Sequence, residues 1–160
     1  MAPAANQDLA AALSLLQAGA NAPRSAPETS EAALLEALAL APQDFDIRLG
    51  AYRFYFYTHR YDEALVHCEE LIAHAARGLN IATDWRLVTP QDAPFGTIAF
   101  APGLFLQTLI AWGYCQLRLG ETGRARQALA HAAWLDPSDR FGAAAIVGHI
   151  DARHAEDNEE

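Results

Sequence analysis

The segment from Leu106 to Asp139 constrains the fold most, because its small residues, turn glycine and stop proline are spaced as in two packed helices. Small side chains let two helix backbones approach closely, a glycine lets the chain reverse, and a proline stops a helix. The residues with these roles are Gly113 and Ala125 for close approach, Gly120 for the turn, Leu129 and Ala132 for filling the gap to the next helices, and Pro137 for the stop. The sequence therefore predicts a helix–turn–helix unit at residues 106–137.

This unit, which also carries Leu109 and Trp112 in its first helix, resembles the tetratricopeptide repeat (TPR), a helix–turn–helix of about 34 residues. The departure is Gln116, at a position where the family usually has an aromatic residue. The resemblance implies that helix pairs stack into a short α-solenoid. It also implies a concave groove that binds a segment of another protein.

A second unit is predicted at residues 44–78, around the aromatic-rich stretch YRFYFYTHRYDEAL. YDEAL is typical of the start of a second repeat helix, and Tyr55 occupies the aromatic position of the first. Tyr52 departs from the pattern, since a small residue is usual at its position, and no proline closes the unit. A degenerate first helix pair is expected at residues 6–42.

The remaining segments complete the predicted architecture. We expect a long irregular insertion at residues 79–104, a capping helix at 138–154 and an acidic tail at 155–160. The predicted fold class is therefore all-α, a short α-solenoid of two to three TPR-like helix pairs plus a C-terminal capping helix, within a single domain.

Local signals predict where several helices begin and end. The first helix is expected at residues 6–20, the second within 28–42, the third within 43–60 and the fourth at 61–78. Ser30 or Thr29 is expected to cap the second helix, and Asp44 or Asp46 the third, because short polar side chains accept hydrogen bonds from the free N–H groups of a first turn. Gly78 is expected to stop the fourth helix.

Composition excludes several classes of function. The chain has 160 residues, of which 52 % are apolar, and a net charge of −9, so no nucleic acid or anionic membrane surface is expected as a partner. It has no apolar run of about 18 residues that would span a membrane, and no basic region typical of a signal peptide. Its two cysteines form no CxxC pair, which suits a reducing compartment and predicts a cytoplasmic location.

The repeat register assigns part of the aromatic stretch to a partner-binding groove. In this register Tyr52 and Tyr55 face the packed helix pair, and other side chains face the groove. The predicted groove residues are Arg53, Phe56 and Tyr57 in the earlier unit and Ile110, Tyr114 and Arg118 in the later one. Aromatic residues and arginine are the usual anchors of protein interfaces. The alternative is that these aromatics are all core, with arginine stems lying over them.

The insertion supplies a second set of candidate partner-binding residues. Trp85, Arg86 and Phe95 are anchor-type residues in a segment that the repeat does not need. The alternative is that Trp85 and Phe95 plug one end of the short stack.

Signals of catalysis and metal binding are weak. The sequence has no nucleophile elbow, phosphate-binding loop or HExxH motif, so we expect neither an enzyme nor a cofactor. His67 and His74 lie two helical turns apart, about 10 Å, which is too far for both to bind one metal ion. His67 and Cys68 are adjacent, and a site for a soft metal there would need Cys115 or another histidine brought in by folding, so no metal site is predicted.

A narrower resemblance covers residues 46–144, from the aromatic stretch through IATDWRLVTPQDAPFG to LDPSDRFGA. These segments together resemble small repeat proteins found with nitrogen-fixation genes in diazotrophic bacteria. The resemblance implies a non-enzymatic accessory protein that binds nitrogenase or one of its maturation components. Two alternatives remain open: a chaperone of type III secretion, and a metal-handling factor that uses Cys68, Cys115 and histidines.

Overall fold

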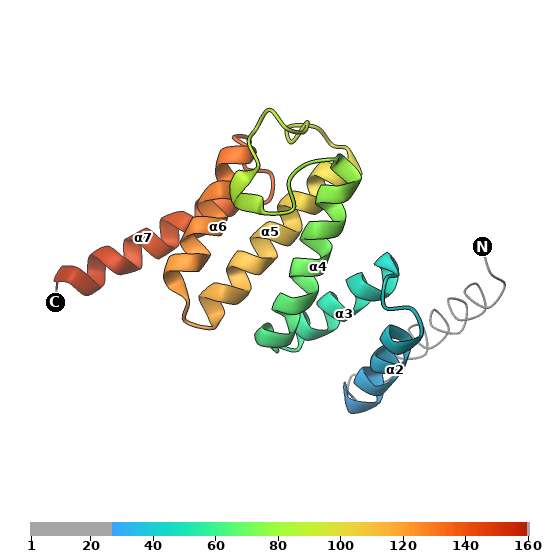
Figure 1. Cartoon of the computed structure of the whole chain (residues 1–160). Helices are drawn as coiled ribbons and strands as arrows, with labels where there is room; N and C mark the ends of the chain where they lie inside the picture. Colours follow the sequence, from blue (N-terminus) through green and yellow to red (C-terminus); the bar gives the residue numbers. More distant parts are fainter. Residues whose placement is uncertain (1–26, 160) are drawn as a thin grey trace. The chain divides into compact units, whose positions relative to one another are not determined.

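The computed structural model describes residues 27–159, which form six α-helices and one short 3-10 helix and contain no strand. The predicted all-α fold class is confirmed for this part of the chain, and the arrangement is consistent with a helical repeat (Figure 1). The helices are α2 (Pro27–Leu40), α3 (Phe45–Tyr57), α4 (Tyr61–Leu79), η1 (Trp85–Leu87), α5 (Phe100–Arg118), α6 (Thr122–Leu135) and α7 (Ala143–Glu159). The helix predicted within residues 6–20 lies outside the described residues.

The chain divides into two compact units, Met1–Arg60 and Tyr61–Glu160. We describe each by itself, as residues 27–60 and 61–159. The boundary falls inside the predicted repeat 44–78, between its two helices, so the pairing of these helices and the single domain stay predictions.

In the first unit, α2 packs against α3. Ala37 and Ile47 are fully buried, and the hydroxyl of Tyr55 donates to Glu31, 3.1 Å away. Arg60 also donates to Glu31 at 2.6 Å and lies over the Tyr55 ring. The hydrogen bond from Arg60 is the main reason that the pKa of Glu31 is lowered. These contacts fasten the end of α3 to α2.

The starts of α2 and α3 resolve the predicted caps. Asp44 caps α3, because its carboxylate accepts the N–H of Ile47 at 3.0 Å. The cap predicted at Ser30 or Thr29 is wrong, since α2 already begins at Pro27. Proline is favoured at a first helical position, where its missing N–H would have no partner in the helix.

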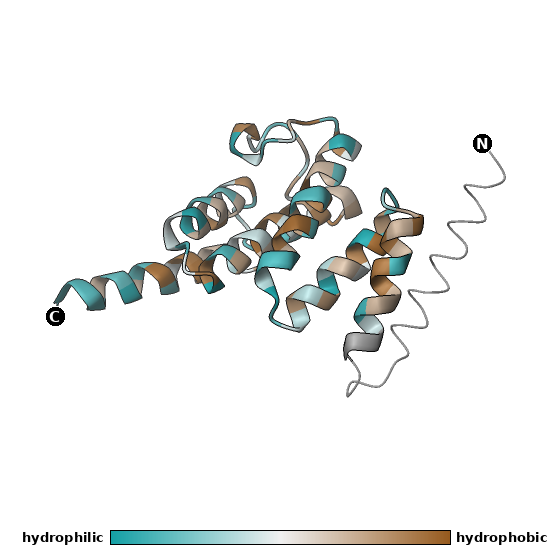
Figure 2. Ribbon diagram, turned by 60° about the horizontal axis from the view of Figure 1, so that its bottom comes forward, coloured by the Kyte–Doolittle hydropathy of each residue, from teal (hydrophilic) through white to brown (hydrophobic). Residues whose placement is uncertain are grey.

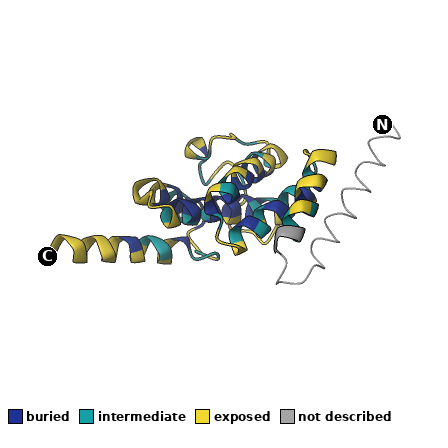
Figure 3. Ribbon diagram, turned by 90° about the horizontal axis from the view of Figure 1, so that it is seen from below, coloured by how far each residue is buried: buried dark blue, intermediate teal, exposed yellow. Residues whose placement is uncertain are grey.

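In the second unit, α4 packs against α5, α5 also against α6, and α6 against α7 (Figure 1). The buried side chains face the neighbouring helices, and α5 carries the most of them, including Phe105, Leu106 and Leu109. The outer half of α7 is exposed and mostly hydrophilic (Figures 2 and 3).

Three helices end with a residue in the left-handed region, which lets the next N–H groups bond back to the helix. His59 ends α3 at φ 62°, Asn80 ends α4 at φ 56°, and Gly120 ends α5 at φ 85°. The predicted turn at Gly120 is thereby confirmed. The predicted stop at Gly78 is wrong, because α4 continues to Leu79 and Asn80 takes the left-handed conformation.

Two predicted boundaries also shift. Helix α5 begins at Phe100, so it takes the last residues of the insertion predicted at 79–104; Pro102 is tolerated because it lies in the first helical turn. Helix α7 runs from Ala143 to Glu159 rather than 138–154, and thus includes most of the predicted tail. The residues before it form the turn between α6 and α7.

Gly113 lies at a close approach of α5 to α6, as predicted. A Cβ atom at this position would lie 2.9 Å from Cγ of Leu129 and 3.4 Å from the backbone oxygen of Ala125. The distance to Leu129 is shorter than ordinary packing allows, and that to Ala125 is at the limit of normal contact, so the spacing of the two helices here depends on the absence of a side chain.

We therefore expect Gly113→Ala to lower the free energy of unfolding by about 1–2 kcal/mol, because the overlap with Leu129 outweighs the better helix propensity of alanine. Urea unfolding followed by circular dichroism measures this. Gly148→Ala is the matched control: a Cβ there meets nothing within 4 Å, so this change in α7 should be neutral or stabilising. Equal effects of the two substitutions would contradict the close approach at Gly113.

Candidate functional site

The segment between α4 and α5 packs onto the ends of α5 and α6 through two buried apolar side chains. Val88 is fully buried, and Phe95 is only 2 % exposed, with its ring 5.7 Å from that of Phe105. The carbonyl of Val88 accepts a hydrogen bond from Nε2 of His131 at 2.8 Å. The segment is therefore a fixed part of the second unit, despite its lack of regular structure (Figure 1).

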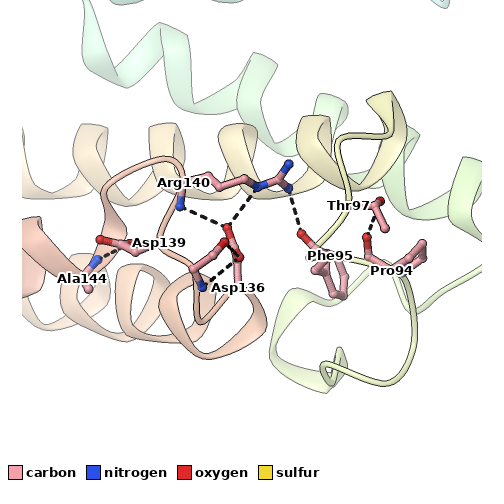
Figure 4. Close-up of polar contacts among 8 residues, drawn as sticks. Pro94, Phe95, Thr97, Asp136, Asp139, Arg140 and Ala144 are labelled. Atoms are coloured by element: carbon pink, nitrogen blue, oxygen red, sulfur yellow. Dashed lines mark hydrogen bonds and ion pairs between the residues drawn. The ribbon is translucent and has the colours of Figure 1, made fainter.

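The turn between α6 and α7 also holds the insertion in place, through hydrogen bonds and an ion pair (Figure 4). Arg140 donates to the carbonyl of Phe95 at 2.8 Å and forms an ion pair with Asp136 at 3.5 Å. The carboxylate of Asp136 also accepts the N–H and hydroxyl of Ser138 and the N–H of Arg140. Arg140 thus connects the turn to the insertion.

The same contacts determine the charge state of Asp136. Burial by itself would raise the pKa of this carboxyl group, but the hydrogen bonds from Ser138 and Arg140 together outweigh burial and lower the pKa below its ordinary value. Asp136 is therefore a carboxylate at neutral pH and holds the turn in shape.

An aromatic row crosses this end of the unit. We use the name aromatic row for Trp112 of α5, Trp85 of η1, and His131 and Trp134 of α6, whose rings contact one another in that order. Successive ring centroids are 5.9, 5.3 and 5.3 Å apart. These spacings are typical of attractive aromatic pairs. The row is buried at Trp112 and opens to solvent at Trp134, which is 53 % exposed.

Charged and apolar groups border the row. The indole N–H of Trp112 donates to the carboxylate of Glu69 at 3.2 Å, and the guanidinium of Arg86 lies 5.3 Å from the Trp85 ring. Asp84 pairs with Arg86 at 3.4 Å. Leu87 is 68 % exposed. Exposed tryptophan and leucine beside a few charged groups make this surface suited to contact with another macromolecule.

The predicted insertion residues therefore have different positions. Phe95 is core, as the plug interpretation expects, so its predicted role as a partner-binding residue is wrong. Trp85 is half-buried within the aromatic row, and Arg86 is exposed at its border. The structure leaves these two available to a partner.

The predicted groove residues fall in both units. Arg53 and Tyr57 are exposed and Phe56 is half-buried in the first unit. In the second unit, Ile110 packs partly buried against a cluster of α6 and α7 residues. A common groove for all six residues stays a prediction.

Tyr114 and Arg118 form a small cluster with Tyr61 of α4. The Tyr61 and Tyr114 rings are 6.0 Å apart, and the Arg118 guanidinium lies 5.3 Å from the Tyr61 ring. Burial raises the pKa of the Tyr61 hydroxyl, and the charge of Arg118 offsets this only in part. Sequence reasoning missed Tyr61.

Folding brings Cys68 and Cys115 together between α4 and α5, as the metal hypothesis requires. Both thiols are fully buried and free, and the pKa of Cys68 is raised by its hydrogen bond with Cys115 and by burial. A metal ion would have to displace the proton of this thiol, because the ligand form is the thiolate. Among residues 27–159, no group of three or more His, Cys, Asp or Glu side chains could hold a metal ion.

A shallow hollow lies between α5, α6 and the turn that precedes α7. Its empty volume is about 150 Å³, open solvent included, and its lining includes Leu106, Ile110 and Phe141. Pockets for small ligands usually have about 300–1,000 Å³. This hollow is therefore too small to be a typical ligand site.

Sequence reasoning also missed His131 and Trp134. Their spacing of three residues on one helix does place them on the same face. Nothing in the sequence, however, indicates that Trp85 lies beside His131 in the folded chain.

None of the helices in the described part of the chain combines the length and apolar character that a membrane crossing needs.

Residues 27–159 thus form an all-α fold that is consistent with a helical repeat and carries an aromatic surface built partly on the insertion. No protein-family model and no solved structure matches the chain, so the TPR resemblance stays a prediction. The chain is 33 % identical over 132 residues to an Azotobacter chroococcum mcd 1 protein described as "Uncharacterized 19.8 kDa protein in nifW 5'region". The match covers 80 % of this chain and 73 % of the relative, and the chain belongs to the same family.

We expect Asp136→Asn to destabilise the fold by about 1–3 kcal/mol at pH 7, because the new amide donors face the N–H of Arg140 and the ion pair is lost. The pKa of Asp136 is lower in the folded state than in the unfolded chain. Its carboxylate therefore stabilises the fold at any pH above the ordinary aspartate pKa, and this stabilisation is lost as the pH falls through the pKa of the folded state. The difference between variant and wild type should therefore shrink toward pH 3, as measured by urea unfolding.

Asp157→Asn is the control, because Asp157 lies on the exposed outer half of α7. This substitution should leave the unfolding free energy nearly unchanged at pH 7. An Asp136→Asn variant as stable as the control at pH 7 would contradict the role of the turn.

Proposed function

We propose that this protein is a non-enzymatic protein-interaction module that serves nitrogen fixation as an accessory factor. The aromatic row would be the surface that contacts its partner, with nitrogenase or one of its maturation components as the expected partner. One observation carries the proposal: Trp134 is exposed at the end of a row of rings that runs through His131 to Trp85, on a part of the unit that several contacts hold in place.

The physical argument rests on preorganisation. A partner gains most from an apolar surface that is already ordered, because little side-chain entropy is then lost on binding. Trp85 is held between Trp112 and His131, and the insertion that carries it is anchored at Val88 and Phe95. Tryptophan is among the residues that most often dominate the binding energy of interfaces.

The relative supports the biological setting. Its description places it in the region 5′ of nifW, and nif genes are those of nitrogen fixation. This position favours the nitrogen-fixation hypothesis over that of a type III secretion chaperone. The metal-handling hypothesis is the weaker one, because Cys68 and Cys115 are fully buried and the described residues bring no third ligand to them.

Affinity purification from a diazotrophic host grown under nitrogen-fixing conditions tests the proposal, with three versions of the tagged protein. Trp134→Ser alters the aromatic row, whereas Arg53→Glu combined with Tyr114→Ala alters the predicted groove. We expect Trp134→Ser to reduce recovery of the nitrogen-fixation partner about tenfold or more, and the groove variant to retain it.

Circular dichroism establishes that each variant is folded before recovery is compared. If the groove variant loses the partner and Trp134→Ser keeps it, the aromatic row is not the binding surface. If wild type recovers no component of the nitrogen-fixation system, the proposed function is wrong.

A further inference from the structure

The aromatic row also indicates what kind of partner segment it accepts. Trp85 already has a cation over its ring, because Arg86 lies 5.3 Å from the ring centroid. Trp134, at the open end of the row, contacts His131 and has no cation over it within residues 27–159. Since tryptophan is the best cation–π acceptor among the side chains, its exposed face suits a guanidinium or ammonium group.

The charges along the row favour the same kind of group. The positive charge of Arg86 is paired with Asp84 at 3.4 Å. At the other end, Glu69 accepts from the indole of Trp112 and has no ion-pair partner among the described residues. The unpaired charge bordering the row is therefore negative.

The net charge of the whole chain is also negative, and it attracts positively charged groups over a longer range. It carries 20 acidic side chains against 11 basic ones, for a net charge of −9. Such a charge speeds the approach of a basic partner surface and disfavours an acidic one.

We propose that the aromatic row binds a basic segment of the partner protein, in which one arginine or lysine stacks on Trp134 and a second pairs with Glu69. Three ring-to-ring steps of 5.3–5.9 Å separate Trp112, beside Glu69, from Trp134. They span at most roughly 17 Å, which an extended chain covers in about five residues. The two basic residues therefore stand at most about five positions apart.

This inference rests on the proposed function, and peptides of defined sequence test it. The probe is acetyl-Arg-Gly-Gly-Gly-Gly-Arg-amide, and the matched peptide has neutral citrulline at both ends. Binding to the purified protein is measured by calorimetry. A change in tryptophan fluorescence emission shows whether the peptide binds at the aromatic row, because the chain's three tryptophans are all in the row. The arginine peptide should bind about tenfold or more tightly than the citrulline peptide.

Substitutions in the protein distinguish binding of the peptide at the aromatic row from non-specific electrostatic attraction to the acidic chain. Trp134→Leu should abolish binding of the arginine peptide, and Glu69→Gln should weaken it while keeping an acceptor for the indole of Trp112. Glu156→Gln removes the same charge from the exposed half of α7 and should leave the affinity unchanged.

Equal binding of the arginine and citrulline peptides would overturn the inference, as would an equal effect of Glu69→Gln and Glu156→Gln. Its failure is distinguishable from failure of the proposed function. If the native partner is lost with Trp134→Ser but the two peptides bind equally, the row is the binding surface and the partner segment is not basic. If recovery of the partner does not depend on Trp134, the proposed surface itself is wrong.

Discussion

The connection between Arg140, Asp136 and the carbonyl of Phe95 is the interaction on which the candidate surface depends. It joins the turn after α6 to a segment that has almost no regular structure of its own. A loop of this kind becomes ordered only when other contacts repay the entropy that its residues lose. Burial of Val88 and Phe95 supplies the apolar part of those contacts, and His131 and Arg140 supply the polar part.

The consequence is that Trp85 is held against α5 and α6. A tryptophan on a free loop would have to be ordered by the partner, at a cost in affinity. Here the ring is already fixed between Trp112 and His131, and Trp134 extends the same surface into solvent. By placing Trp85 between Trp112 of α5 and His131 of α6, the insertion joins side chains from separate helices into one continuous surface. The family relationship to a protein from the nifW region gives this surface its proposed biological setting.

The sequence predicted those features that depend on local chemistry. The helices follow from composition and periodicity, Gly120 from the conformation that the turn requires, and Gly113 from the close approach of two backbones. Helix ends were predicted less well. Asn80 ends α4 in place of Gly78, because a short polar residue also tolerates the left-handed region.

The aromatic row could be predicted only in part. Trp85 and Arg86 stood out as anchor-type residues, but Phe95 is of the same type and proved to be core. The path of an irregular segment depends on long-range contacts such as that between Arg140 and Phe95, 45 positions apart, which leave no periodic signal in the sequence. For the same reason, nothing in the sequence connected Trp134 with Trp85.

Zero-length cross-linking of the purified complex tests the central claim most directly. A carbodiimide joins carboxylates to amines in contact, and this chain contains no lysine, so the amines come from the partner, apart from the chain's own N-terminus. If the partner binds at the aromatic row, mass spectrometry should find its lysines joined to Glu69 or Asp84. Cross-links confined to the α7 carboxylates Glu156, Asp157 and Glu159, or to Glu36 and Asp46 of the first unit, would contradict the account.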